Sequence, residues 1–244
     1  MPVLRERKNA KSLIVFIHGF MGGPGQFKEF AELAYREGYS VCAILLPGHG
    51  GSVWDFGRFG LCDWENHLQG ELDRHRKTYQ NIFLVGHSMG GLLALNASLV
   101  KQNHVCGVVL LSTPLKLDFR PHSLLRKASL IILPAGHAVK DSYWQAKGFS
   151  GFAICPNWIK PFCGFSRLLR KTQPILQHIS VPVLAVHSLN DETVSFKSAG
   201  MFIESLRNTT IKHMTLEKSW HSYYTPIERE LIQSALLEFY NECL

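Results

Sequence analysis

Short apolar runs alternate along the chain with longer segments of helical character. The apolar runs predict buried strands at 13–17, 40–46, 81–85, 105–111, 181–187 and 210–216. The segments between them predict helices at 26–37, 63–79, 89–101, 195–206 and 226–242. Because the strands are apolar at nearly every position and helices separate them, the pattern favours an α/β protein whose mostly parallel central sheet has helices on both faces.

The segment Gly86-His87-Ser88-Met89-Gly90 has the pattern G-x-S-x-G and lies between a predicted strand and a predicted helix. This context is typical of a nucleophile elbow, in which a sharp turn exposes the serine hydroxyl at the carboxyl edge of a sheet. Small neighbours allow the backbones to pass closely at such a turn. The alternative is a glycine-rich turn with an incidental serine, and the segments described below argue against it. Ser88 is therefore the candidate nucleophile.

A serine nucleophile needs a base and an orienting acid, which in this arrangement follow it along the chain as Asp or Glu and then His. Asp191 lies in the polar loop after the strand at 181–187, and His221 lies in the loop after the strand at 210–216. We predict that Asp191 is the acid and His221 the base. Glu192 is the competing candidate for the acid.

The oxyanion that forms during attack needs two backbone N–H donors. Met89 follows the nucleophile directly and supplies one candidate donor. A glycine-dense loop, His18 to Gly25, follows the first predicted strand and allows a main-chain amide to point inward. Phe20 in this loop is the second candidate donor, and its ring is placed to line an acyl pocket.

The chain resembles the α/β-hydrolases of the bacterial carboxylesterase and monoacylglycerol-lipase-like group over about residues 11–242. The motifs that carry the resemblance are HGFMGG (18–23), LPGHGGS (46–52), VGHSMGG (85–91), HSLNDETV (187–194) and SWH (219–221). The resemblance implies an α/β-hydrolase fold and the same triad of Ser88, Asp191 and His221. It departs at Trp220, where the family usually has glycine, and at Gly51, which lengthens a glycine run.

The alternation of strands and helices stops at about residues 114–175, where the resemblance is also weakest. This segment is rich in proline and aromatic residues. In this fold an insertion at that place usually forms a cap over the active site. We therefore expect a hydrolase core at 1–113 and 176–244 with a small cap at 114–175, whose apolar underside suits an acyl or aromatic group.

Positive charge is concentrated in the predicted cap. Residues 116–171 contain ten Lys and Arg but only two Asp, so the segment carries +8 of a chain whose formal net charge is +7. One interpretation is a solvated face, and the other is attraction of an anionic substrate or contact with a membrane surface. Nothing in the sequence resembles a nucleic-acid-binding module, so we expect no nucleic acid partner.

Several classes of protein are excluded by composition and spacing. A hydrophobic content of 46% with 18% charged residues indicates a globular core, and no apolar run reaches the ~18 residues of a membrane span. The six cysteines form no C-x-x-C pair and show no metal-ligand spacing with histidine. We expect reduced thiols, no metal, no cofactor and a cytoplasmic protein without a signal peptide.

These observations predict a serine hydrolase that cleaves carboxylic esters of short to medium acyl chains through an acyl-enzyme. The substrate would be a small amphipathic ester. The same triad also serves thioesterases and C–C bond hydrolases, and some proteins of this fold only bind small molecules. The sequence leaves these alternatives, and the oligomeric state, open.

Overall fold

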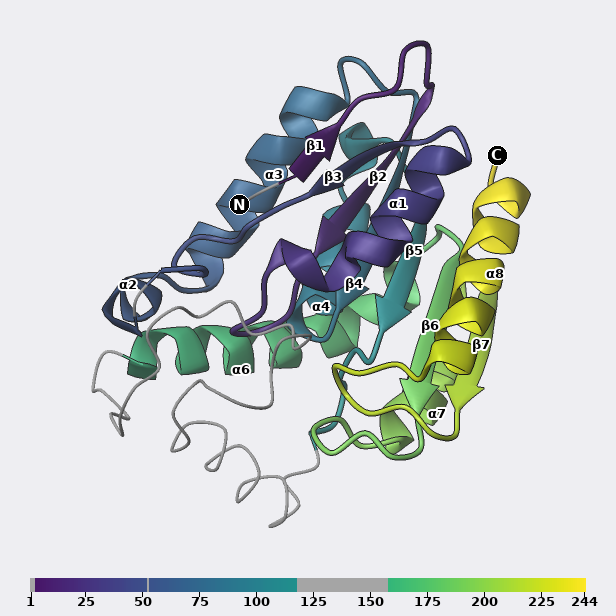
Figure 1. Cartoon of the computed structure of the whole chain (residues 1–244). Coiled ribbons are helices and arrows are strands. Elements are labelled where there is room, and N and C mark those ends of the chain that lie inside the picture. Colours follow the sequence, from purple (N-terminus) through teal and green to yellow (C-terminus); the bar gives the residue numbers. More distant parts are fainter. Residues whose placement is uncertain (1–2, 52, 118–157) are drawn as a thin grey trace.

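The computed structural model describes residues 3–51, 53–117 and 158–244 (Figure 1). Its centre is a seven-stranded sheet in the order β1-β3-β2-β4-β5-β6-β7, in which only β1 is antiparallel to its neighbour. The strands are β1 Val3–Arg5, β2 Ser12–Ile17, β3 Ser40–Ala43, β4 Asn81–His87, β5 Val105–Leu111, β6 Val183–Ser188 and β7 Ile211–Leu216. The predicted α/β class and mostly parallel sheet are confirmed.

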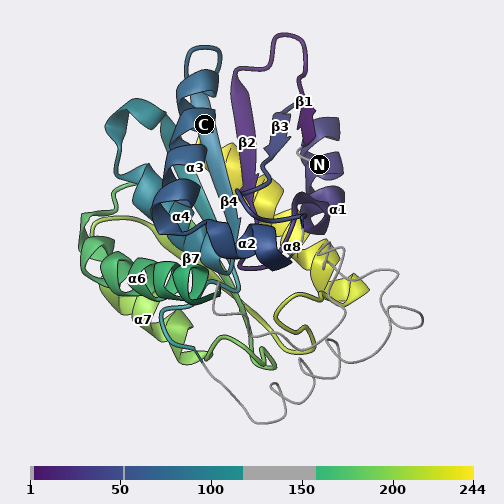
Figure 2. The ribbon, with the colours of Figure 1, turned by 90° about the vertical axis from the view of Figure 1, so that its left-hand side faces the viewer.

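Helices cover both faces of the sheet (Figures 1 and 2). Helices α1 and α8 lie on one face, whereas α3, α4, α6 and α7 lie on the other. The α-helices are α1 Lys28–Arg36, α2 Val53–Arg58, α3 Leu61–His75, α4 Met89–Ser98, α6 Ile159–Ile175, α7 Lys197–Ser205 and α8 Pro226–Glu242. Short 3-10 turns cover Pro24–Phe27, Lys101–Asn103 and Leu176–His178.

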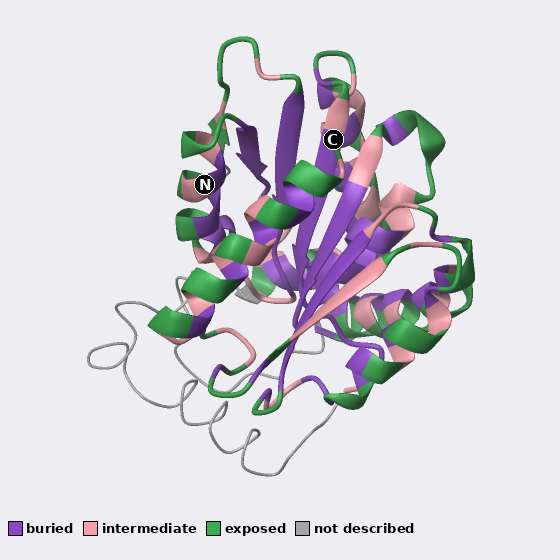
Figure 3. Ribbon diagram, turned by 90° about the vertical axis from the view of Figure 1, so that its right-hand side faces the viewer, coloured by how far each residue is buried: buried purple, intermediate pink, exposed green. Residues whose placement is uncertain are grey.

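The interior strands of the sheet are coloured as buried in Figure 3, and β2, which lies next to the central strand β4, shows why. Leu13 and Val15 point into the cluster beneath α3 and α4, whereas Ile14 and Phe16 point into the cluster beneath α1 and α8. All four side chains are fully buried, as expected where side chains alternate between two covered faces. The apolar run therefore stabilises two cores at once.

Three of the helices and strands are absent from the sequence-based prediction: β1, α2 and α6, the last of which lies within the predicted cap. Strand β1 has only three residues, two of them exposed, and α2 has six residues. Neither is long enough to give a clear hydrophobic period. The predicted helix at 63–79 ends earlier, at His75, because the chain turns there and the Gln80 amide donates to Lys11 O.

Most of the predicted cap, residues 118–157, lies outside the described residues. Its described end contains α6, which packs against α2, α3 and α4. Leu168 is fully buried in the core, and the Asn96 amide donates to the Thr172 hydroxyl over 2.8 Å. The division of the chain into core and cap therefore stays a prediction. Within the described residues, no helix combines the length and the apolarity needed to cross a membrane.

Candidate active site

Ser88 occupies the sharp turn between β4 and α4. Its backbone has φ 53° and ψ −119°, a strained conformation for a residue with a side chain, and its amide donates to Leu111 O over 2.8 Å. The turn places Ser88 at the carboxyl edge of the sheet, where the strand arrows end in Figure 1. The local geometry is that of a nucleophile elbow.

The close packing of this turn depends on glycine. A Cβ atom built on Gly90 would collide with the backbone carbonyl of Ile17, and one on Gly86 would collide with the backbone of Gly90. A side chain at Gly90 would push α4 away from β2, and one at Gly86 would push α4 away from β4. The glycines of the motif are therefore required by contact between backbones.

Asp191 and His221 meet across the loops that follow β6 and β7. The His221 Nδ1 lies 2.8 Å from Asp191 Oδ2, and Asp191 Oδ1 accepts the amides of Thr193 and Val194 over 2.8 and 2.7 Å. Burial raises the pKa of Asp191, but the charge of His221 and these hydrogen bonds outweigh it and leave the pKa below its usual value. The ionised carboxylate accepts the Nδ1 proton, so Nε2 carries the lone pair that a base needs.

Glu192, the competing acid, has a different contact. Its Oε2 accepts the backbone amide of His221 over 3.1 Å and therefore holds the loop. The carbonyl of the same residue is also held, because His87 Nε2 donates to His221 O over 2.8 Å. Burial, followed by the charge of His221, lowers the pKa of His87 to about 3, so this ring is neutral. Glu192 and His87 thus hold the amide and the carbonyl of His221.

The same loop is also held by hydrogen bonds to a buried carboxylate, that of Glu228 in the first turn of α8. Its Oε1 accepts the amides of Glu217 and Lys218 over 2.6 and 3.0 Å, and its Oε2 accepts the Ser219 hydroxyl. The Ser188 hydroxyl donates to Ser219 O, which ties the loop to the end of β6. Sequence analysis missed Glu228, which in the printed sequence is one acidic residue in an amphipathic helix.

The predicted oxyanion donors lie in the two segments that meet at Ser88. A Cβ atom on Gly19 would lie 3.0 Å from Ser88 Cβ, so the loop after β2 passes directly beside the nucleophile. Phe20 follows Gly19, and Met89 follows Ser88. The Phe20 ring packs against Phe162 and Phe165 of α6, with ring centroids 5.1 and 5.4 Å apart.

Two further histidines hold this loop. His18 Nε2 accepts the Leu46 amide over 3.0 Å, and His49 Nε2 accepts the Met21 amide over 3.2 Å. Burial lowers the pKa of His49 to about 4 and that of His18 well below its ordinary value. Both rings are neutral acceptors that shape the loop.

Trp220, the departure from the family pattern beside His221, is 39% exposed. Its amide donates to Tyr223 O over 2.8 Å, and its ring lies against the Tyr223 ring with centroids 5.8 Å apart. The bulky side chain thus packs within its own turn, while the backbone of the turn leads into His221.

Comparison with known proteins identifies the family. A family model described as serine aminopeptidase, S33, matches residues 8–144, which is more than half of the chain. The chain belongs to this family of α/β hydrolases. The resemblance inferred from the motifs is thereby confirmed.

Two individual relatives share a modest sequence identity with the chain. The chain is 24% identical over 231 residues to a thermostable monoacylglycerol lipase of Bacillus sp. (strain H-257), covering 93% of this chain and 89% of that protein. It is 36% identical over 98 residues to a 2-succinyl-6-hydroxy-2,4-cyclohexadiene-1-carboxylate synthase of Escherichia coli O1:K1 / APEC, but these residues span only 39% of this chain and 36% of the synthase.

One solved structure matches this structure over almost its entire length. A solved structure from the work on LipS and LipT, two metagenome-derived lipolytic enzymes, matches with a TM-score of 0.78 and 19% identity. The match covers 99% of this chain and 97% of that one. At this identity the likeness establishes the fold.

Proposed function

We propose that the protein hydrolyses carboxylic esters through an acyl-enzyme on Ser88, with Asp191 and His221 completing the triad. The observation that carries the proposal is the 2.8 Å Asp191–His221 pair, which lies at the same sheet edge as a serine in a strained elbow. The monoacylglycerol lipase among the relatives and the lipolytic enzymes of the same fold support an ester as substrate.

The reaction begins when His221 Nε2 takes the proton of Ser88 and the Ser88 oxygen attacks the ester carbonyl. Ionised Asp191 stabilises the imidazolium that forms. The amides of Phe20 and Met89 hold the oxyanion of the tetrahedral intermediate. His221 then protonates the leaving alcohol, and water, activated by the same ring, releases the acid and regenerates Ser88.

The substrate proposal rests on the aromatic residues that pack on the loop passing beside Ser88. The Phe20 ring contacts the rings of Phe162 and Phe165, which joins the loop after β2 to α6 through aromatic side chains. Such side chains suit the acyl chain of a short to medium monoester, whose polar alcohol faces solvent. With 114–175 as cap and the remaining residues as core, the protein would act on a small amphipathic ester as a cytoplasmic enzyme.

The decisive experiment combines Ser88→Ala with a fluorophosphonate probe and p-nitrophenyl esters of increasing acyl length. Wild type should be labelled at Ser88 and turn over the shorter esters, whereas Ser88→Ala should lose both properties, because loss of a triad serine costs orders of magnitude in kcat. Ser98→Ala, at the end of the same helix, is the matched control and should behave as wild type.

Two outcomes would count against the proposal. Near wild-type turnover by Ser88→Ala would exclude Ser88 as the nucleophile. Labelling of Ser88 without turnover of any oxygen ester would favour a thioesterase, a C–C bond hydrolase, or a reaction of the kind named for the Escherichia coli synthase. Coenzyme A thioesters and carbon–carbon substrates then separate these possibilities.

A further inference from the structure

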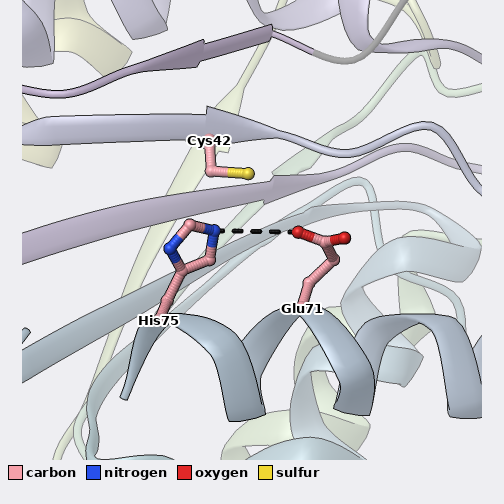
Figure 4. A group of neighbouring side chains, drawn as sticks. All are labelled: Cys42, Glu71 and His75. Carbon is pink, nitrogen blue, oxygen red and sulfur yellow. Dashed lines mark ion pairs between the residues drawn. The ribbon is translucent and has the colours of Figure 1, made fainter. Parts of the chain in front are cut away.

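Three side chains with metal-binding atoms converge between β3 and the last turn of α3, far from Ser88. Cys42 points from β3 toward Glu71 and His75 on α3 (Figure 4). Their sulfur, oxygen and nitrogen atoms all lie within 4.8 Å of one another. We propose that this cluster binds one zinc ion. The mechanism above makes no use of these residues, so the proposal is independent of the proposed function.

The spacing of the two helical ligands suits chelation. Glu71 and His75 are four residues apart, and such residues lie on one face of a helix. Metalloprotease helices use the same i, i+4 spacing to place two ligands on zinc. Glu71 Oε2 and His75 Nε2 are already 3.7 Å apart. Tetrahedral zinc with ligand bonds near 2.0–2.3 Å requires donor separations of about 3.3–3.6 Å. Small side-chain rotations would bring all three donors to zinc.

His75 provides a second, separate observation. The residue is only 4% exposed, yet its Nε2 has no hydrogen-bond partner. Burial lowers the pKa of His75, which favours the neutral ring, and the 3.7 Å contact with Glu71 is too long for a hydrogen bond. A buried polar atom without a partner destabilises the fold, and a metal bond would satisfy this nitrogen.

The set of donors selects the metal. A thiolate, an imidazole and a carboxylate together suit zinc, whereas Mg²⁺ and Ca²⁺ prefer oxygen ligands alone. Burial raises the pKa of Cys42 to about 12, so the thiol is protonated without metal and releases its proton to solvent when the sulfur–zinc bond forms. With the thiolate and Glu71 as anions, the occupied site carries no net charge, which suits its partly buried position.

Access to the cluster is through Glu71, whose side chain is 16% exposed. Its carboxylate also accepts Arg74 Nη1, but the Arg74 side chain is 68% exposed, so this ion pair is weak and is readily given up or shared. Among the described residues, Cys42, Glu71 and His75 supply the donors, and water from the exposed side would complete four-coordination.

The role of such an ion would be structural. Helix α3 returns toward the amino end of the sheet, where Gln80 donates to Lys11 O just before β2. Zinc at the cluster would join the last turn of α3 to β3, close to the sheet edge formed by β1. The ion would add a direct cross-link that restrains both elements.

Cobalt and zinc titrations of the full chain test the proposal, after removal of metal with a chelator. Co²⁺ should bind one per chain with a thiolate-to-cobalt charge-transfer band in the near ultraviolet, and equimolar Zn²⁺ should abolish the band. Zinc at about 100 times its Kd should raise Tm by about 5 °C or more. Both signals are independent of ester turnover, so loss of the esterase proposal would leave this test intact.

Variants locate the ion. Cys42→Ala should lose the cobalt band, and Glu71→Gln, which replaces a side chain near the surface, should weaken zinc binding at least tenfold and reduce the Tm shift. Cys62→Ala removes an exposed thiol from the same helix and should keep both signals. Far-ultraviolet circular dichroism checks that each variant is folded.

The proposal is overturned by any of three results: no thiolate band in wild type, a band that survives in folded Cys42→Ala, or equal zinc shifts in wild type and Glu71→Gln. The last two results would assign the binding to other cysteines or histidines of the chain.

Discussion

Replacing Glu228 with glutamine tests whether the loop that carries His221 is held by a buried charge. The substitution keeps the size of the side chain but removes the negative charge. The carboxylate accepts three short hydrogen bonds, from the amides of Glu217 and Lys218 and from the Ser219 hydroxyl, and a longer one of 3.4 Å from the Thr225 hydroxyl. Glutamine retains one acceptor oxygen and presents an NH₂ group in place of the other.

The expected loss of stability follows from the three short bonds. A hydrogen bond to a charged group contributes about 1.5–3 kcal/mol and a neutral one about 0.5–1.5, so each bond loses about 1 kcal/mol. Relief from burying a charge offsets part of the loss. We expect the free energy of unfolding of Glu228→Gln to fall by about 2 kcal/mol, and Tm by about 4–8 °C. Because His221 lies two residues beyond Ser219, kcat should fall about tenfold while KM stays within about twofold.

Urea unfolding and steady-state ester kinetics measure both effects. Glu230→Gln is the matched control, because Glu230 lies on the same helix and is exposed. If Glu228→Gln equals Glu230→Gln in both stability and kcat, the carboxylate does not hold the loop. A loss of stability with unchanged kcat would show that the loop position is fixed by its other contacts, with Glu192 and His87.

Three further predictions concern the site and its surroundings. Asp191→Asn should lower kcat by roughly three orders of magnitude, because the imidazolium loses its partner. Glu192→Gln keeps an acceptor for the His221 amide, so its kcat should stay within about tenfold of wild type. The reverse order in steady-state kinetics would assign the acid to Glu192. Burial holds the folded-state pKa of His49 and His187 at about 4, below the unfolded value of about 6.5, so the unfolded chain binds more protons at low pH. The stability that each neutral ring contributes is complete above pH 6.5 and is lost as pH falls toward 4, at about 1.4 kcal/mol per pH unit for each ring. In urea unfolding, His187→Gln should reduce the slope of the free energy of unfolding against pH over this range. If the basic residues of 116–171 recruit substrate, kcat/KM for an anionic ester should fall with added salt while a matched neutral ester is unaffected; equal responses would indicate a solvated face.

The sequence pattern was sufficient to predict those parts of the fold whose signals lie close together along the chain. The elbow around Ser88 combines a strand, a turn and a helix within about twenty residues, and each part has its own signal. Asp191 and His221 could be placed because parallel strands end at one edge of the sheet, so the loops after them meet.

The contacts that the sequence could not predict join residues far apart in the chain. Glu228 looks like any acidic residue in the first turn of a helix, and only folding brings its carboxylate to the amides of Glu217 and Lys218. Cys42 and His75 likewise lack a local spacing that indicates a metal, and they meet because α3 packs against β3. Pairings of this kind depend on the exact position of each helix on the sheet.

Helix α6 illustrates a different limit. Proline normally interrupts helices, and the sequence analysis predicts no helix in this proline-rich part of 114–175. In the structure Pro161 lies in the first turn, where its missing N–H has no helical partner, and Pro174 is the second-last residue. The prolines mark the two ends of a helix, and their separation was the signal that could have predicted it.

Within the elbow, substitutions at Gly90, which brings α4 against β2, and substitutions at Ser88 should affect the protein in different ways. The backbone of Ile17 occupies the space that a side chain at Gly90 would need. Every substitution there should therefore reduce the amount of folded protein in a cell, whatever its effect on catalysis. Ser88 has the opposite character. Its strained backbone would be relaxed by glycine, so the residue proposed for the chemical step is one that folding alone would replace. Selection on abundance and selection on activity would thus favour different residues at positions two apart.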